Sequence, residues 1–286
     1  MPPHDHVIDG IRVPWILYGT AWKEDRTSGL TETAIRNGFR GIDTANQRKH
    51  YDEAAVGQGI LSAIRAGIVT RDDLFLQTKF TFTGGQDHRL PYDPRAPIAQ
   101  QVEQSVASSL RHLNTTWLDS LVLHGPSVRT GLAVSDLQAW QAMEDLVDRG
   151  IVRLLGISNV ALDQLELLCS RARIPSHFVQ NRCYAAMGWD SAIRRCCSDA
   201  GITYQGFSLL TANRAIVESE PLAVISRRHN LTPEQIVFRF AMQVGMIPLT
   251  GTTSEVHMRA DIAVADFELS SEEMALIESI GVRTGH

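Results

Sequence analysis

The sequence predicts an α/β fold, a (β/α)8 TIM barrel with a β-hairpin at its N-terminus. Short apolar runs alternate with amphipathic stretches at roughly 30 residues per unit, which suits a barrel of ~250 residues. Three of the runs end on an ionisable residue, Asp43, Lys79 or His124. Because a buried charge without a partner is costly, these strand ends are expected to converge on one polar site. A doubly wound sheet is the alternative, but residues 19–22 lack the Gly-x-Gly-x-x-Gly turn that it would need.

The predicted elements follow in chain order. A hairpin over 7–13, with Asp9-Gly10 as its tight turn, precedes the barrel and is expected to cover its floor. Apolar residues at helical spacing then predict a helix after each strand, with Gly38, Gly67 and Gly150 at three of the helix ends. We find no linker or low-complexity tract, so a single domain over 1–286 is predicted. The expected barrel strands are 15–20, 39–43, 74–80, 118–124, 152–157, 178–180, 202–207 and 246–249.

Composition limits the class of protein. Hydrophobic residues make up 44% and charged residues 21%, as in ordinary globular proteins. A net charge of -5 without a clustered basic face gives no support for nucleic-acid binding. No apolar run reaches the ~18 residues of a membrane span, no secretory signal is recognised, and the four cysteines form no Cys-x-x-Cys pair. A cytoplasmic enzyme, monomeric or weakly dimeric, is expected.

Six short motifs stand at the ends of strands or in the following turns, and a seventh, Val56-Gly57, lies in the helix expected after the second strand. In order they are 19–22 (Gly-Thr-Ala-Trp), 41–45 (Gly-Ile-Asp-Thr-Ala), 56–57 (Val-Gly), 78–79 (Thr-Lys), 123–126 (Leu-His-Gly-Pro), 156–159 (Gly-Ile-Ser-Asn) and 179–181 (Val-Gln-Asn). Each motif is weak alone, but with the ordered set in place the chain resembles the aldo-keto reductase superfamily over essentially its whole length. Ile247-Pro248 is also similar to that family.

The resemblance implies a nicotinamide-dependent carbonyl reductase with a catalytic tetrad of Asp43, Tyr51, Lys79 and His124. Carbonyl reduction needs a proton at oxygen while hydride reaches carbon, and a tyrosine hydroxyl is a suitable acid once its pKa, near 10 in water, is lowered. Lys79 would lower that pKa, Asp43 would hold Lys79 charged, and His124 would position the substrate oxygen.

The sequence alone leaves open which residue is the proton-donating acid. Counted forward from Asp43, the family's tyrosine slot falls on Arg48, and counted back from Glu53 it falls on His50. The turn is therefore about two residues longer than usual. Tyr51 is the favoured acid on chemical grounds, and His50 is the competitor because imidazole titrates near neutral pH.

The cofactor implied by the resemblance is NADPH, with NADH not excluded. Ser158, Asn159 and Gln180 match the residues that hold the nicotinamide carboxamide, although Ser158 and Asn159 could instead cap a helix. Phe207 would stack on the nicotinamide in place of a tyrosine. The Lys-Ser pair and the arginine that bind the 2′-phosphate of NADPH are not plainly present, and hydroxyls with helix N-terminal amides could replace them. The other expected cofactor residues are Thr20, Ser208, Leu209, Thr252, Thr253, His257 and Asp261.

Two other functions fit the same scaffold. One is a non-reductive step, dehydration or isomerisation of a natural-product intermediate, which the altered tyrosine turn would favour. The other is a nicotinamide-binding regulatory protein without turnover. The expected ligand is a small carbonyl compound, with no nucleic acid or membrane as partner. No metal is expected, because no His-x-His pair ends the first strand.

Overall fold

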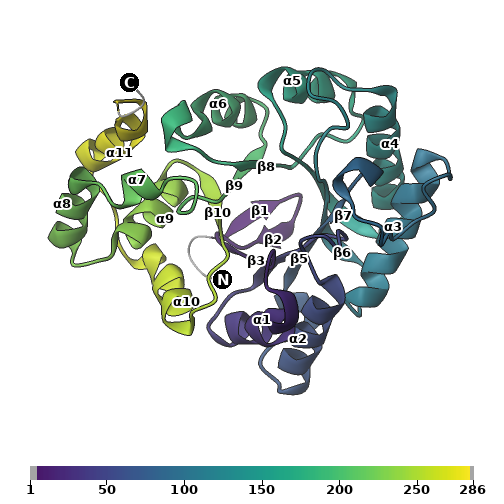
Figure 1. The fold of residues 1–286 in the computed structure, drawn as a ribbon, viewed down its shortest axis with the longest axis horizontal. Coiled ribbons are helices and arrows are strands. Elements are labelled where there is room, and N and C mark those ends of the chain that lie inside the picture. Colours follow the sequence, from purple (N-terminus) through teal and green to yellow (C-terminus); the bar gives the residue numbers. More distant parts are fainter. Residues whose placement is uncertain (1–4, 284–286) are drawn as a thin grey trace.

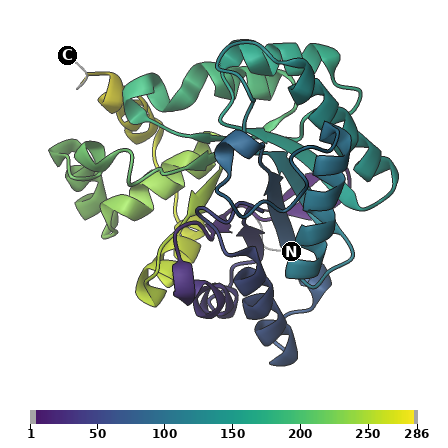
Figure 2. The same cartoon turned by 45° about the vertical axis from the view of Figure 1, so that its right-hand side comes forward.

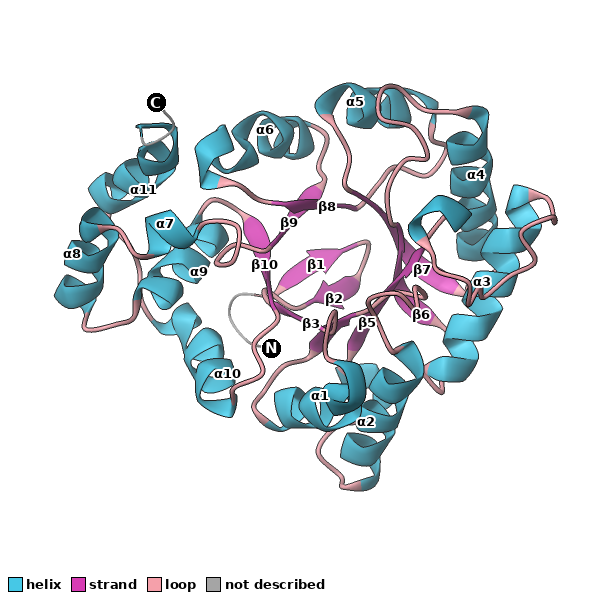
Figure 3. Cartoon of the chain, viewed as in Figure 1, coloured by secondary structure: helices cyan, strands magenta, loops and turns pink. Residues whose placement is uncertain are grey.

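The computed structural model describes residues 5–283 and contains a closed barrel of eight parallel strands surrounded by helices (Figures 1 and 3). Around the barrel the order is β10-β3-β4-β5-β6-β7-β8-β9, so the last strand pairs with the first and closes the ring. This confirms the predicted fold class and excludes the open doubly wound sheet. The strands are β3 (Leu17–Gly19), β4 (Gly41–Asp43), β5 (Phe75–Phe80), β6 (Leu118–Leu123), β7 (Val152–Ser158), β8 (Phe178–Arg182), β9 (Thr203–Phe207) and β10 (Met246–Thr250).

The N-terminal hairpin closes the floor of the barrel. Its strands, β1 (His6–Ile8) and β2 (Ile11–Val13), pair antiparallel. Asp9 and Gly10 both have positive φ, 48° and 77°, as a tight two-residue hairpin turn requires. Val13 is fully buried in one apolar cluster with residues of the barrel strands, and Ile8 and Ile11 pack against it. Viewed down the barrel, the hairpin lies within the ring of strands (Figure 1).

The helices form the outer layer, and Gly57 allows two of them to pack closely against each other. At Gly57 in the second helix, a Cβ would lie 1.9 Å from the carbonyl oxygen of His112, at the end of the third. A side chain at position 57 would therefore push these two helices apart, which gives a physical reason for the Val-Gly motif. The helices are α1 (Thr27–Arg36), α2 (Glu53–Arg65), α3 (Ile98–His112), α4 (Val134–Asp148), α5 (Leu162–Arg171), α6 (Ser191–Asp199), α7 (Arg214–Val217), α8 (Glu220–His229), α9 (Pro233–Gln243), α10 (Glu255–Ile262) and α11 (Ser271–Arg283).

Helix α11 was not predicted. It lies on the outside of the helical layer near the C-terminus (Figure 2) and packs on the 3-10 segment Ala185–Asp190 that follows β8. The indole Nε1 of Trp189 donates to the carbonyl oxygen of Ile277, at 2.9 Å. Helix α11 therefore supports the segment Ala185–Asp190, which follows β8. Among residues 5–283, no helix combines the length and apolar character needed to cross a membrane.

Candidate active site

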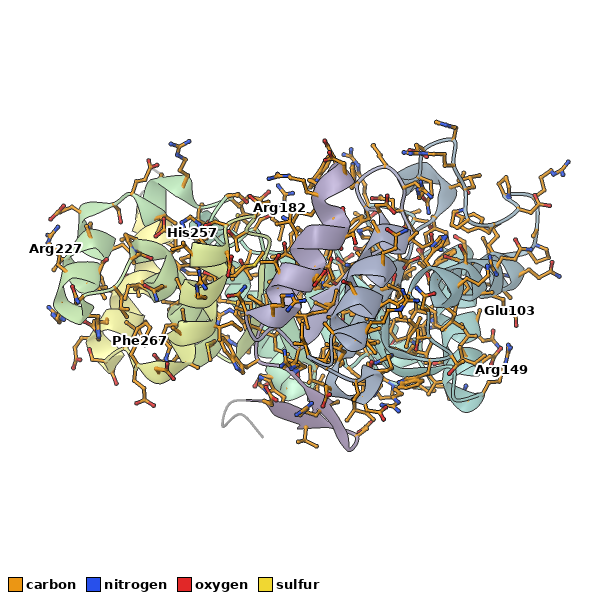
Figure 4. All side chains as sticks on the ribbon, turned by 90° about the horizontal axis from the view of Figure 1, so that it is seen from below. Glu103, Arg149, Arg182, Arg227, His257 and Phe267 are labelled. Carbon is orange, nitrogen blue, oxygen red and sulfur yellow. The ribbon has the colours of Figure 1, made fainter. Side chains whose placement is uncertain are left out.

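A large cavity of about 1290 Å³ lies at the carboxyl ends of the barrel strands. Its lining includes Asp43, Tyr51 and His124 at one end and residues of α9 and α10 at the other. Arg182 and His257, which also line it, lie in the half of the molecule away from the β1–β2 hairpin (Figure 4). The cavity therefore opens on the face where parallel barrels place their chemistry.

Asp43 and Lys79 form a buried ion pair on the neighbouring strands β4 and β5. The Nζ of Lys79 lies 2.7 Å from both carboxylate oxygens of Asp43 and donates to the carbonyl oxygen of Thr44 at 2.8 Å. Asp43 and Lys79 are only 2% and 1% exposed. Burial lowers the pKa of Lys79, and the negative charge of Asp43 opposes that shift. Two of the three strand-end residues that the sequence singled out are thus direct partners.

Tyr51 lies beside this ion pair. The Nζ of Lys79 is 5.4 Å from the centre of the Tyr51 ring, and the ring of His124 lies edge-on at 6.0 Å between centroids. Lys79 was expected to lower the pKa of Tyr51, but the direction of the shift is the opposite. Burial, and then the carboxylate of Asp43, raise that pKa. Tyr51 is therefore held as a neutral phenol.

His124 is oriented by a single hydrogen bond. Its Nδ1 lies 2.6 Å from the hydroxyl oxygen of Thr81, which leaves Nε2 as the nitrogen for a ligand. Burial, followed by the positive charges of Lys79 and His50, lowers the pKa of His124 to about 3. The imidazole is consequently neutral near pH 7, suited to hydrogen bonding with a substrate oxygen but not to acting as a charged acid.

His50, the alternative acid, packs against Trp22. Its ring lies 4.1 Å from the ring of Trp22, centroid to centroid, with 35° between the planes. The backbone N–H of Trp22 also donates to the carbonyl oxygen of His50, at 2.8 Å. His50 lines the cavity, but its ring packs on Trp22, whereas the ring of Tyr51 lies beside Lys79 and His124.

The three residues expected at a nicotinamide carboxamide lie together. Ser158 Oγ donates to the carbonyl oxygen of Gln180 at 2.6 Å, and Asn159 Nδ2 donates to that of His124 at 2.8 Å. Helix α5 is instead begun by Ala161, whose N–H donates to the Gln164 side chain at 3.0 Å. Ser158 and Asn159 are therefore not helix caps, and both line the cavity.

The remaining predicted cofactor residues divide into two groups. Thr20 and Thr253 do not line the cavity: Thr20 is buried, with its hydroxyl donating to the carbonyl oxygen of Asp43 at 3.0 Å, and Thr253 is exposed. Asp261 accepts a 2.6 Å hydrogen bond from Thr250, and burial raises its pKa to about 6. The predicted residues that do line the cavity here are Phe207, Ser208, Leu209, Thr252, His257 and Asp261.

Sequence reasoning missed two cationic residues of the cavity. Lys23 is buried, its Nζ donates to the carbonyl oxygen of Gly251, and burial lowers its pKa. Lys23 directly follows the Gly-Thr-Ala-Trp motif, and this position in the sequence could have identified it as a residue of the site. Arg182 lies over the ring of Phe207, 5.6 Å from its centre. Within residues 5–283, no group of three or more His, Cys, Asp or Glu side chains is arranged to hold a metal ion.

Comparisons with known proteins agree over nearly the whole chain. The model of the Aldo/keto reductase family matches residues 18–282. The chain is 28% identical to the uncharacterized oxidoreductase YtbE of Bacillus subtilis (strain 168), over 95% of this chain and 90% of that protein. It is 27% identical to prostaglandin-E(2) 9-reductase of Oryctolagus cuniculus, over 95% and 89%. A Bombyx mori aldo-keto reductase solved in complex with NADP superposes with a TM-score of 0.80 at 25% identity, over 96% and 91% of the two chains.

Proposed function

Because the chain belongs to the aldo/keto reductase family, we propose that it reduces an aldehyde or ketone with NADPH. The family and relatives named as reductases support an oxidoreductase that uses a nicotinamide cofactor. The observation that carries the finer proposal is the meeting of Asp43, Lys79, Tyr51 and His124 at one end of the large cavity.

Each of these residues has a distinct task in the proposed reaction. In the proposed tautomer, the Thr81 hydroxyl donates to Nδ1 of His124, so that Nε2–H donates a hydrogen bond to the carbonyl oxygen. Tyr51, kept protonated by burial, delivers its hydroxyl proton to that oxygen as negative charge develops on it. Lys79, anchored by Asp43, then stabilises the phenolate that remains. Bound reduced nicotinamide would supply the hydride to the carbonyl carbon.

The cavity fits such a cofactor. Phe207 lines the cavity, and Gln180 and Asn159 are hydrogen-bonded to Asp43 and His124 of the tetrad. Toward α10, the cavity is lined by Thr252 and His257. Its volume of about 1290 Å³ exceeds the ~300–1,000 Å³ of common ligand sites. That size leaves room for a dinucleotide and a small substrate together.

The preference for NADPH over NADH is proposed from two basic side chains that line the cavity, Lys23 and His257. These side chains supply positive charge or hydrogen-bond donors for the 2′-phosphate of NADPH. The carboxyl group of Asp261, which also lines the cavity, would repel that phosphate when ionised. The NADP of the Bombyx mori relative supports the same choice. Separate titrations with NADPH and NADH, followed by tryptophan fluorescence, test it directly: NADPH should bind more tightly, and a lower Kd for NADH would refute the preference.

The catalytic proposal is tested by turnover. Consumption of NADPH should accelerate when activated aldehydes are added to wild-type protein. Tyr51→Phe should lose that activity while retaining NADPH binding, whereas His50→Asn should retain most of it. Full activity in Tyr51→Phe with loss in His50→Asn would give the acid role to His50. Binding of NADPH without turnover of any carbonyl compound would instead favour a regulatory or non-reductive function.

A further inference from the structure

Two glutamine side chains meet across the interior of the barrel just below Asp43. Gln77 comes from β5 and Gln205 from β9, which are four strands apart in a ring of eight and so stand opposite each other. Both are 0% exposed. Barrel interiors are dominated by branched apolar side chains, and a buried polar network is costly unless each member is satisfied. This amide bridge therefore calls for a physical explanation.

Asp43 determines which way two of the amides point. An ionised carboxylate paired with Lys79 can only accept hydrogen bonds. The side-chain atoms that approach it from Gln77, at 2.8 Å, and from Gln180, at 3.0 Å, must therefore be the Nε2 donors. This assignment follows from the charge of Asp43 and does not depend on how the amide atoms are labelled.

Gln205 takes the second hydrogen of both amides. Its Oε1 accepts from Gln77 Nε2 at 2.8 Å and from Gln180 Nε2 at 2.9 Å, while its own Nε2 donates to Gln77 Oε1 at 3.1 Å. An amide nitrogen has two hydrogens, so both donors of Gln180 are used by Asp43 and Gln205. Because Gln180 lines the cavity, the group that it has left for a ligand is its carbonyl oxygen.

We propose that Gln205 is a positioning residue that locks Gln180 with its carbonyl toward the nicotinamide site, so that the site selects a ligand carrying an N–H donor there. This inference rests on the proposed nicotinamide cofactor. The primary carboxamide of nicotinamide offers such a donor. A methyl ketone in the same place offers none and leaves Gln180 Oε1 unpaired in a buried site. A purely structural bridge would stabilise the barrel without affecting this choice.

The test compares NADP⁺ with its 3-acetylpyridine analogue, in which a methyl group replaces only the carboxamide NH₂. Dissociation constants are measured by tryptophan fluorescence. Wild-type protein should bind NADP⁺ about tenfold more tightly than the analogue. In Gln205→Met, the Gln180 amide keeps only its hydrogen bond to Asp43. The carbonyl of Gln180 is then aimed less strictly at the ligand, so the ratio should fall to within about threefold of unity.

Two controls separate selectivity from general damage. 2′-Phospho-ADP-ribose, which lacks the nicotinamide, should bind Gln205→Met and wild-type protein equally. Gln101→Met removes another buried glutamine, which in α3 donates to the carbonyl oxygens of Pro94 and Ala96, and should keep the wild-type ratio.

The outcomes are distinct. Equal binding of both dinucleotides by wild-type protein overturns the inference, and so does full discrimination in a Gln205→Met variant that still binds 2′-phospho-ADP-ribose. If that variant does not fold, the wild-type ratio and a Gln77→Met variant, which removes the partner of Gln205, decide in the same way. Failure of wild-type protein to bind any nicotinamide dinucleotide would instead refute the proposed function, and with it this inference.

Discussion

Loss of the Lys79 ammonium should strongly destabilise the protein, because it leaves a buried carboxylate without its cationic partner. Lys79→Met keeps a linear apolar side chain but removes three hydrogen bonds, two to Asp43 and one to the Thr44 carbonyl. Asp43, 2% exposed, would retain only the amide donors of Gln77 and Gln180. Breaking a buried pair on one side costs about 3–5 kcal/mol. The free energy of unfolding should fall by that amount.

A double-mutant cycle in urea measures the effect. Asp43→Asn removes the negative charge while leaving an oxygen to accept from the glutamine amides. The double variant should therefore be more stable than Lys79→Met alone, with a coupling energy above about 1 kcal/mol. Arg95→Met is the matched control, because Arg95 is paired with Asp93 at 3.5 Å with 90% of its side chain exposed. Its effect should stay within about 0.5 kcal/mol.

Two results would contradict this expectation: a cost of less than about 1 kcal/mol for Lys79→Met, or additivity of the two substitutions. Either result would mean that Asp43 does not depend on Lys79 to remain a buried carboxylate. The orientations of the Gln77 and Gln180 amides would then have to be set by a group other than the carboxylate of Asp43.

The remaining predictions concern the acid, the imidazole and helix packing. Tyr51→Phe should lower kcat about 10²–10⁴-fold with an unchanged Kd for NADPH, and a loss below tenfold would remove Tyr51 as the acid. The pKa of His124 is about 3 in the folded protein and about 6.5 unfolded, so below pH 6.5 the unfolded state binds the extra proton and stability falls with falling pH. His124→Gln should therefore lose less stability than wild type between pH 6.5 and 5 in urea titrations, and parallel curves would contradict this. Gly57→Ala should cost about 1–3 kcal/mol by thermal unfolding, because its Cβ meets the carbonyl oxygen of His112. Gly29→Ala, on a helix face with open space around it, should instead be neutral or stabilising by up to about 1 kcal/mol.

The order of the barrel and the location of its polar end could be predicted because both depend on local sequence. In a chain that packs helices around a parallel sheet, apolar runs of strand length alternate with segments whose apolar residues have helical spacing. Both patterns can be recognised without long-range information. Asp43, Lys79 and His124 could be placed at one site for a related reason: carboxyl ends of parallel strands share one face of a barrel. Helix α11 was missed because it lies beyond the eighth unit and packs on the turn after β8, a contact between residues distant in sequence.

Only the tertiary structure decided how those side chains behave. Tyr51 was expected to have a lowered pKa because Lys79 is near, yet burial and then the carboxylate of Asp43 raise it. Gln77 and Gln205, 128 residues apart, were invisible as a pair because a hydrogen bond across the barrel leaves no trace in local periodicity. Burial, desolvation and cross-barrel contacts depend on neighbours that the chain brings together only when the ring closes. For this reason the alternation of residues determined the scaffold, and closure of the barrel determined the protonation and orientation of the groups within it.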